Sequence, residues 1–221
     1  LAEDKWNDAW SEYFREKGFS VVKVNSKKGG GIKSINGVIQ EACKEKIERD
    51  RKRGILNRPV RAMVVGIPNV GQSTFINALA GKACAKTGNK PGVTKGKQWI
   101  RLNKNVELLD TPGILWPKFE DPKVGLNLAF CGSIKDEILD MATLALELIK
   151  VLTADYPDLL KERYKLDSLS EDGLENMEAI AMKRGFILSG KRIDYERCAK
   201  TVLDEFGGGI IGHITLEKAQ A

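Results

Sequence analysis

The sequence predicts an α/β domain with a mostly parallel sheet, followed by a small all-helical domain. Between residues 60 and 109, segments typical of strands alternate with a segment typical of a helix, as in domains whose parallel strands are joined by helices. Beyond about Ile134 the strand signal fades and helical patterns dominate. We therefore expect the α/β domain to cover residues 1–145 and the helical domain residues 146–221.

The first fifty residues predict a helix, a strand and a second helix. Residues 3–17 carry aromatic side chains at helical spacing, and residues 19–24 are rich in valine, as short strands are. A glycine-rich turn over residues 25–31 ends this strand. One long helix is then expected from Ile32 to about Arg53.

The central segments supply the sheet. Residues 60–65 are mostly apolar, as in a buried strand, and residues 73–79 have the pattern of a helix. Two more strands are expected near residues 98–102 and 106–109. In the last part of the chain, four helices are expected: Ile134–Leu152, Leu159–Tyr164, Leu174–Lys183 and Tyr195–Phe206.

Composition excludes several classes of protein. With 221 residues, 42% of them hydrophobic and 30% charged, the chain is too apolar for a disordered tail and, with four cysteines, too poor in cysteine for a disulfide scaffold. The cysteines are scattered and the single histidine is His213, which argues against a zinc site. No window resembles a signal peptide or a membrane span, so the expected location is cytoplasmic.

Residues 66–74 match the P-loop pattern G-x-x-x-x-G-K-[ST], with Gln72 where lysine is expected. Glycines are needed there because backbone N–H groups must turn inward around phosphate oxygens. The helix that follows adds the positive end of its dipole, and the Ser73 hydroxyl is placed to bind magnesium. The nucleotide-binding residues expected from this loop are Gly66, Pro68, Asn69, Val70, Gly71, Gln72, Ser73 and Thr74.

Two further motifs follow in the order of a nucleotide hydrolase. Thr94, in the polar segment 91–94, is expected to reach the metal and the γ-phosphate. Residues 110–113 form a D-x-x-G pattern, which puts the Asp110 carboxylate at the end of a strand and the Gly113 amide beside the γ-phosphate. Taken singly, each of these two motifs is better explained by an ordinary turn. Together they favour nucleotide binding, with Ser73, Thr94 and Asp110 at the metal.

A guanine-reading N-K-x-D motif does not follow Gly113, yet the turn with Asn25 and Ser26 resembles the segment that usually comes after that motif. The order is that of a circular permutation. Across nearly its whole length the chain resembles the ribosome biogenesis GTPase A family, the YlqF-type circularly permuted GTPases. The segments that carry the resemblance are 66–71, 86–88, 91–94, 132–136, 156–164 and, above all, 110–121.

The resemblance implies a monomeric GTPase that binds GTP and GDP with Mg²⁺, docks on the large (50S) ribosomal subunit precursor in the GTP state and leaves on hydrolysis. It implies that Asn69 helps to hold K⁺, and that Asn69, Thr94, Asp110 and Gly113 take part in catalysis. Ile114 stands where many GTPases have a water-orienting glutamine. The guanine reader is expected to end immediately before Leu1, with Asn25 and Ser26 completing the nucleotide site.

Gln72 departs from the P-loop pattern. An ammonium group on the phosphates makes charge-assisted hydrogen bonds that a neutral amide cannot replace, so weak nucleotide affinity and slow hydrolysis are expected. The alternative is therefore a nucleotide-impaired protein that binds RNA or the ribosome and keeps the P-loop as scaffold. An ATPase is a third reading, less consistent with the resemblance.

Basic residues form two groups in a chain of net charge +6. Rows of this kind either bind nucleic acid or form ordinary solvated helix faces, and the resemblance favours ribosomal RNA. The first group is Lys44, Lys46, Arg49, Arg51, Lys52 and Arg53. The second, expected to lack matching acids nearby, is Lys161, Arg163, Lys165, Lys183, Arg184, Lys191, Arg192, Arg197 and Lys200.

Overall fold

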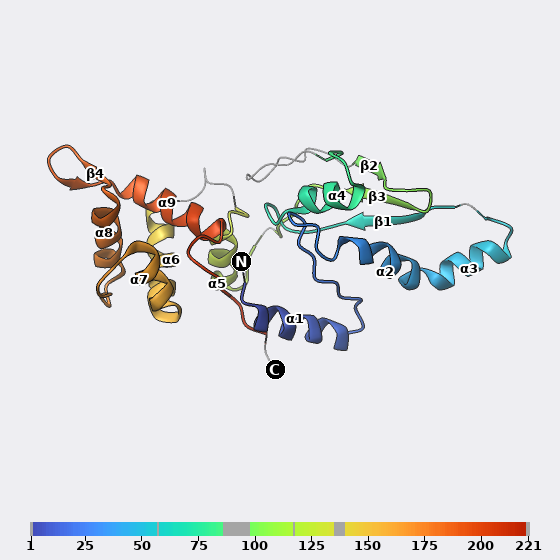
Figure 1. Cartoon of the computed structure of the whole chain (residues 1–221), viewed down its shortest axis with the longest axis horizontal. Helices are drawn as coiled ribbons and strands as arrows, with labels where there is room; N and C mark the ends of the chain where they lie inside the picture. Colours follow the sequence, from blue (N-terminus) through green and yellow to red (C-terminus); the bar gives the residue numbers. More distant parts are fainter. Residues whose placement is uncertain (1, 57, 86–97, 117, 135–139, 220–221) are drawn as a thin grey trace. The chain divides into compact units, whose positions relative to one another are not determined.

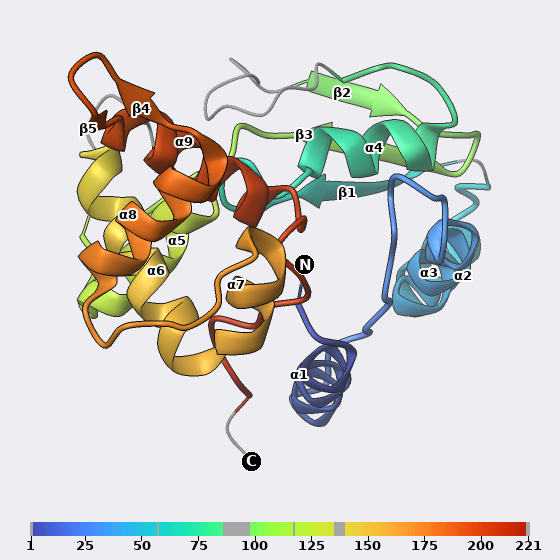
Figure 2. The ribbon, with the colours of Figure 1, turned by 60° about the vertical axis from the view of Figure 1, so that its left-hand side comes forward.

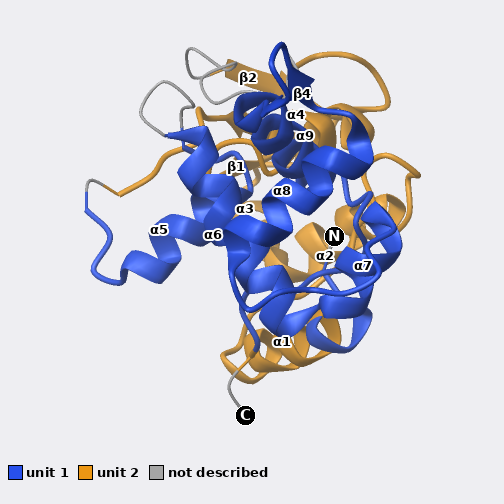
Figure 3. Ribbon diagram, turned by 90° about the vertical axis from the view of Figure 1, so that its left-hand side faces the viewer, with its two compact units in different colours: residues 1–6, 118–218 blue, residues 7–117, 219–221 orange. Residues whose placement is uncertain are grey.

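The computed structural model describes residues 2–56, 58–85, 98–116, 118–134 and 140–219. The chain divides into two compact units, coloured separately in Figure 3. The helical unit comprises Leu1–Trp6 with Lys118–Lys218, and the sheet unit comprises Asn7–Pro117 with Ala219–Ala221. Each is described by itself below. The functional domains expected at residues 1–145 and 146–221 stay a prediction.

The sheet unit is built on three strands, β1 (Val60–Val64), β2 (Gln98–Arg101) and β3 (Val106–Asp110), in the order β1-β3-β2. All three lie where the sequence predicts strands. β1 runs parallel to β3, whereas β2 runs antiparallel to it. The sheet that the structure describes is therefore mixed, not mostly parallel, because residues 102–105 are too few for the crossover that a parallel pairing of β2 and β3 would need.

Helix α4 (Gln72–Ala80) packs on one face of this sheet (Figures 1 and 2). Its Ile76 is fully buried in a cluster with Ile100, Val106 and Leu108 from β2 and β3. In β3 buried side chains alternate with half-buried ones, and the opposite face of the sheet carries exposed residues of the neighbouring strands such as Met63 and Trp99. The predicted helix over residues 73–79 is confirmed.

The predicted strand over residues 19–24 is wrong. The helix before it, α1 (Asp4–Glu16), forms as expected. Residues 19–24 then run without strand pairing in the described structure, and the nearest ladder contact is a single bridge between Asn25 and Gly30. Valine-rich sequence favours an extended backbone, but a strand also needs a neighbour to pair its N–H and C=O groups.

The predicted long helix from Ile32 to Arg53 is broken. It consists of a 3₁₀ turn (Ile32–Ser34), α2 (Ile35–Ala42) and α3 (Lys44–Lys52), with Cys43 in a non-helical conformation between the two helices. The apolar face of α2 packs Ile39 against the sheet cluster. That face does not continue into α3, so no packing holds the two helices in one line.

The helical unit contains α5 (Pro122–Phe130), α6 (Met141–Asp155), α7 (Pro157–Tyr164), α8 (Gly173–Arg184) and α9 (Tyr195–Gly207). Aspartate side chains accept backbone N–H bonds at the start of four of them: Asp121, Asp140, Asp172 and Asp194. Buried side chains of α6, including Leu148 and Leu152, form the centre of one apolar core. No helix in the described ranges is long and apolar enough to span a membrane.

The helical unit is not all-helical. A short hairpin joins α8 to α9, with β4 (Ile187–Leu188) antiparallel to β5 (Arg192–Ile193). Gly190 and Lys191 both adopt positive φ in its turn, as short hairpin turns require. Strands of two residues are too short to show any periodicity, so the sequence pattern could not predict them.

Four of the nine basic residues in the second group have acidic partners, which corrects the expectation that this group lacks them. Lys161 pairs with Asp158 at 2.8 Å and Lys183 with Asp167 at 3.3 Å. Glu205 receives both Arg163 and Arg184. The Lys161–Asp158 pair lies within α7, whereas the other three contacts join different helices or a helix and a loop, so the linear sequence does not reveal them. The five other members of the second group make no ion pair among the described residues: Lys165, Lys191, Arg192, Arg197 and Lys200.

Candidate functional site

The candidate site lies in the sheet unit, at the carboxyl ends of β1 and β3. In the parallel register Val64 stands beside Asp110, so the loops that follow the two strands leave the sheet at the same edge. This edge is where ligands bind in open α/β sheets. The P-loop pattern and the D-x-x-G pattern, about 40 residues apart in sequence, are thereby brought together.

The P-loop leads directly into α4. The helix begins at Gln72 after Gly71, whose φ is 88°, and Asn69 also has a left-handed backbone with φ of 61°. These two residues turn the loop back over the first turn of the helix. No side chain caps α4 through a hydrogen bond at its N-cap, and the N–H groups of a helix start attract anions. Ser73 and Thr74 lie in this first turn, half-buried.

The D-x-x-G segment is tied to the P-loop by backbone contacts. The N–H of Ile114 donates to the carbonyl of Gly66 at 3.1 Å, and the Thr111 hydroxyl donates to the carbonyl of Val64 at 2.7 Å. A Cβ on Gly113 would lie 2.7 Å from the backbone N and Cα of Pro68. Only glycine therefore permits this approach of the two loops.

Asp110 is a buried acid, with 2% of its surface exposed. Its Oδ1 atom has no hydrogen-bond partner among the described residues. Burial raises the pKa of this carboxyl above its ordinary value, against a smaller lowering by the N–H of Thr111. A buried carboxylate oxygen without a partner is costly unless it serves a cation or water. Together with the Ser73 hydroxyl at the start of α4, this donor set fits Mg²⁺.

Gln72 folds back onto the P-loop. Its Nε2 donates to the carbonyl of Val64 in a long hydrogen bond of 3.4 Å. Carbon atoms of the same side chain lie 3.4 Å from the position that a Cβ on Gly66 would take. The side chain thus fills space inside the loop but brings no charge to it.

A hollow of about 530 Å³ opens beside the loop, within the size range of small-ligand sites. The structure brings residues from two distant segments together along it. Its lining includes Asn25, Ser26, Lys27, Val70, Gly71, Gln72, Thr74 and Phe75. The N–H of Lys28 donates to Oδ1 of Asn25 at 3.0 Å and the N–H of Asn25 to the carbonyl of Gly30 at 2.9 Å, so a closed turn holds the first segment.

Sequence reasoning missed two residues of this site. Lys27 lines the hollow and carries a positive charge, and its signal was its position directly after Ser26. Thr111 joins the ends of β1 and β3, and nothing in its sequence position distinguished it from the other members of the D-x-x-G pattern. Thr94, with residues 86–93, lies outside the described residues, as does Asp136.

Comparison with known proteins gives consistent results. A family model described as a 50S ribosome-binding GTPase matches residues 61–179. Ribosome biogenesis GTPase A of Bacillus cereus is 46% identical over 98% of this chain and 73% of the relative. The protein of the same name from Bacillus pumilus is 42% identical over 100% of this chain and 78% of the relative.

A solved structure extends the likeness to the fold. The chain superposes on GNP-bound YlqF from T. maritima with a TM-score of 0.62 and 26% sequence identity, covering 98% of this chain and 77% of that chain. The expected P-loop GTPase fold is thereby confirmed at the level of a mixed α/β architecture.

Replacing Gly113 with alanine should destabilise the chain. The added Cβ would meet the Pro68 backbone at 2.7 Å, and forced overpacking of this kind costs about 1–3 kcal/mol. The measurement is the free energy of unfolding in urea. Gly37→Ala is the matched control, because nothing lies within 4 Å of its added Cβ in α2. Equal stability of the two variants would show that the close approach is absent.

Asp110→Asn should change how stability depends on pH. Burial raises the pKa of Asp110 from 3.8, so between that value and the raised one the folded state binds more protons than the unfolded state. Wild-type stability therefore falls as pH rises through this window. The variant has no such loss, and its stability relative to wild type should grow through the window and then level off.

This dependence is measured by urea unfolding at several pH values from 4 to 8, without nucleotide or metal. Asp155→Asn, which replaces an exposed carboxylate at the end of α6, is the control for removal of one charge. A difference between Asp110→Asn and wild type that does not change with pH would contradict the raised pKa.

Proposed function

We propose a function that starts from the chain's family. The chain belongs to the ribosome biogenesis GTPase A family; it is a GTPase and binds a guanine nucleotide. On this premise we propose an assembly factor for the large (50S) ribosomal subunit. It binds the precursor particle with GTP bound and leaves after hydrolysis to GDP and phosphate. In this proposal it acts in the cytoplasm, as a monomer.

The observation that carries the proposal is the meeting of three segments at one sheet edge. The Asn25 turn and the P-loop line a common hollow, and the D-x-x-G segment contacts the P-loop through Gly113 and Ile114. Phosphate groups suit the loop because the start of α4 directs N–H groups toward it. The Asn25 turn, which lines the same hollow from a different segment of the chain, suits the base.

Ser73, Thr94 and Asp110 would hold Mg²⁺, whose bound charge neutralises phosphate oxygens during transfer. The unpartnered Oδ1 of Asp110 supports this role. Gly113 would donate its amide to the γ-phosphate, and Asn69, exposed in the loop, would help to hold K⁺.

The same hollow supports a circularly permuted order. Asn25 and Ser26 come before the P-loop in sequence, yet they line the site beside it. In the usual order of GTPase motifs such a turn comes last. The permutation explains how an N-terminal turn can complete a site whose phosphate loops come later.

For the helical C-terminal domain, residues 146–221, we propose binding to ribosomal RNA. The supporting observation is that five of its nine singled-out cations make no ion pair in the described structure, and two of these, Lys191 and Arg192, lie in the exposed hairpin. Unpaired surface cations are available to phosphate groups.

A second candidate function is favoured by Gln72 alone. Because this neutral side chain is bonded back to Val64, the loop lacks the cation that normally contacts the phosphates. The chain would then be a ribosome-binding or RNA-binding protein whose P-loop is chiefly structural.

Fluorescent GTP binding tests the proposal directly. If the site selects guanine, unlabelled GTP should displace labelled GTP at a far lower concentration than ATP does, in the presence of Mg²⁺. Gly71→Val, which puts a branched side chain at a left-handed position of the loop, is the control that should lose binding. Equal displacement by ATP and GTP would contradict guanine selectivity.

Gln72→Lys should raise nucleotide affinity at least about 10-fold and increase turnover. The added ammonium replaces a neutral amide with charge-assisted hydrogen bonds to phosphate, each of about 1.5–3 kcal/mol. The measurements are labelled-GTP titration and phosphate release.

Asn36→Lys, which adds the same charge at an exposed position of α2, controls for net charge. A gain in both variants would assign the effect to general electrostatics. No gain in Gln72→Lys would show that the missing lysine does not limit this site.

A further inference from the structure

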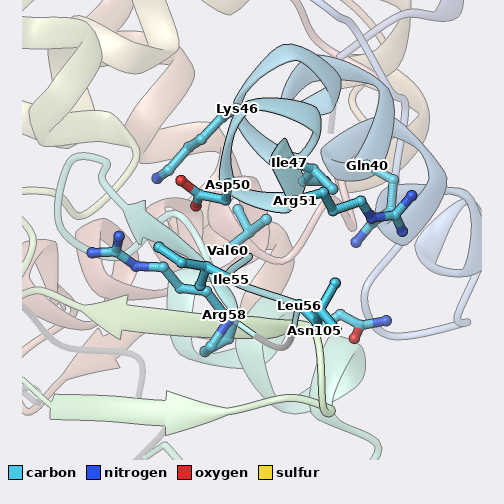
Figure 4. Close-up of a pocket in the computed structure, with 11 residues that line it drawn as sticks. Gln40, Lys46, Ile47, Asp50, Arg51, Ile55, Leu56, Arg58, Val60 and Asn105 are labelled. Atoms are coloured by element: carbon cyan, nitrogen blue, oxygen red, sulfur yellow. The ribbon is translucent and has the colours of Figure 1, made fainter. Parts of the chain in front are cut away.

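A second hollow lies in the sheet unit, away from the P-loop. It is formed between α3 and the segment that returns from α3 to β1, and its volume is about 90 Å³. Figure 4 shows Lys46, Asp50 and Arg51 from the helix and Ile55, Leu56 and Arg58 from the returning segment around it. It shares no lining residue with the hollow beside the P-loop.

The charge of this region is concentrated. Residues 44–58 contain seven basic and three acidic side chains, a net charge of +4 in a chain whose total is +6. Lys44 pairs with Glu41 at 3.8 Å. The other basic side chains make no ion pair among the described residues, and all of them are exposed: Lys46, Arg49, Arg51, Lys52, Arg53 and Arg58.

Backbone hydrogen bonds fix the segment that carries these cations. The N–H of Gly54 donates to the carbonyl of Arg51 and the N–H of Ile55 to that of Asp50, both at 2.9 Å, which is the Schellman pattern of a helix end. The chain then reverses, and the N–H of Val60 donates to the carbonyl of Asn105 at 2.7 Å. Arg58 is thereby returned to the hollow that Lys46 and Arg51 also line.

We infer that this surface, the α3 cluster, binds the phosphodiester backbone of RNA. The inference rests on the proposed function, because the partner it names is the RNA of a ribosomal precursor. Four of the six unpaired cations are arginines, whose planar guanidinium groups match phosphate oxygens with two parallel hydrogen bonds. The exposed Leu56 and Ile55 beside them supply apolar contact for ribose and base faces.

Two other anionic partners fit this surface less well. A membrane-surface helix buries a broad apolar face, whereas α3 has one apolar side chain, Ile47, and that residue lines the hollow. An acidic protein segment would have to avoid Glu45, Glu48 and Asp50, which are interleaved with the cations. These acids repel phosphates as well, but a phosphodiester can take two parallel hydrogen bonds from a guanidinium group, and its ribose and base offer faces to the exposed Ile55 and Leu56.

The test compares two triple variants of the full chain with equal loss of charge. The first is Lys46→Gln, Arg51→Gln and Arg58→Gln, all in the lining of the hollow. The control is Arg15→Gln, Lys17→Gln and Lys33→Gln, exposed cations of the same unit outside the α3 cluster. The probe is a fluorescein-labelled 20-nucleotide oligouridine, titrated by anisotropy at several salt concentrations, and thermal unfolding checks that both variants fold.

The first variant should bind oligouridine at least about 10-fold more weakly at 0.1 M salt than the control. The slope of log affinity against log salt should fall by about 2, because each lost phosphate contact on a single strand contributes about 0.7. The same slope in both variants would overturn the inference while leaving RNA binding itself intact.

Two additional arms separate the remaining outcomes. If the unaltered chain binds no oligouridine but still binds labelled GTP, the RNA part of the proposed function falls together with this inference, and the GTPase part stands. The second arm measures binding to vesicles containing phosphatidylglycerol and to polyglutamate. The first variant could lose affinity for one of these probes as strongly as it loses affinity for RNA. Either result would reassign the α3 cluster to a membrane surface or to an acidic protein, and overturn the inference.

Discussion

The parallel register of β1 and β3 brings together the P-loop and the D-x-x-G segment, on which the candidate site is built. Because Val64 stands beside Asp110, the loops after these strands start side by side and reach backbone contact at Gly113 and Pro68. The Val64 carbonyl joins them further, since it accepts hydrogen bonds from Thr111 and Gln72. A shift of one residue in this pairing would separate the carboxylate from the loop and turn alternate side chains to the wrong face.

The site is costly to the protein when nothing is bound. Asp110 is buried, one of its oxygens has no hydrogen-bond partner among the described residues, and its pKa is raised, so its charged form is disfavoured until a cation approaches. A ligand that binds only the folded state repays such a cost through mass action. With Gln72 neutral, the positive influences in the described part of the site are the start of α4 and Lys27. Binding of a polyphosphate would therefore depend strongly on the accompanying metal ion.

Local sequence patterns predicted the elements whose stability is local or strongly periodic. The three strands and α4 were placed correctly because apolar runs and a glycine loop determine them. Of the four helices with aspartate caps, α8 and α9 were predicted correctly, α6 begins at Met141 and not at the predicted Ile134, and α5 was not predicted. The predicted strand over residues 19–24 is wrong because strand pairing depends on a neighbouring strand, which no local pattern reveals. The prediction of one continuous helix from Ile32 to Arg53 is wrong for a related reason. A helix extends only as far as packing supports its apolar face, and here it breaks at Cys43. The site motifs were recognisable, but the role of Thr111 and the position of Lys27 depend on the fold.

Ion pairing of the basic residues also depends on the fold, and it decides which surface stays positively charged. The two basic groups are similar in composition, and both contain interleaved acids. In the helical unit the acids meet the cations, with Glu205 alone receiving two arginines. Along α3 no ion pair forms between the helix's own side chains among the described residues, although Glu45 and Arg49, Lys46 and Asp50, and Glu48 and Lys52 have the i, i+4 spacing at which helical side chains can meet. Five of the six cations in the first group and five of the nine in the second make no ion pair among the described residues, so a larger share of the charge along α3 is uncompensated. Uncompensated charge is what an anionic partner meets first.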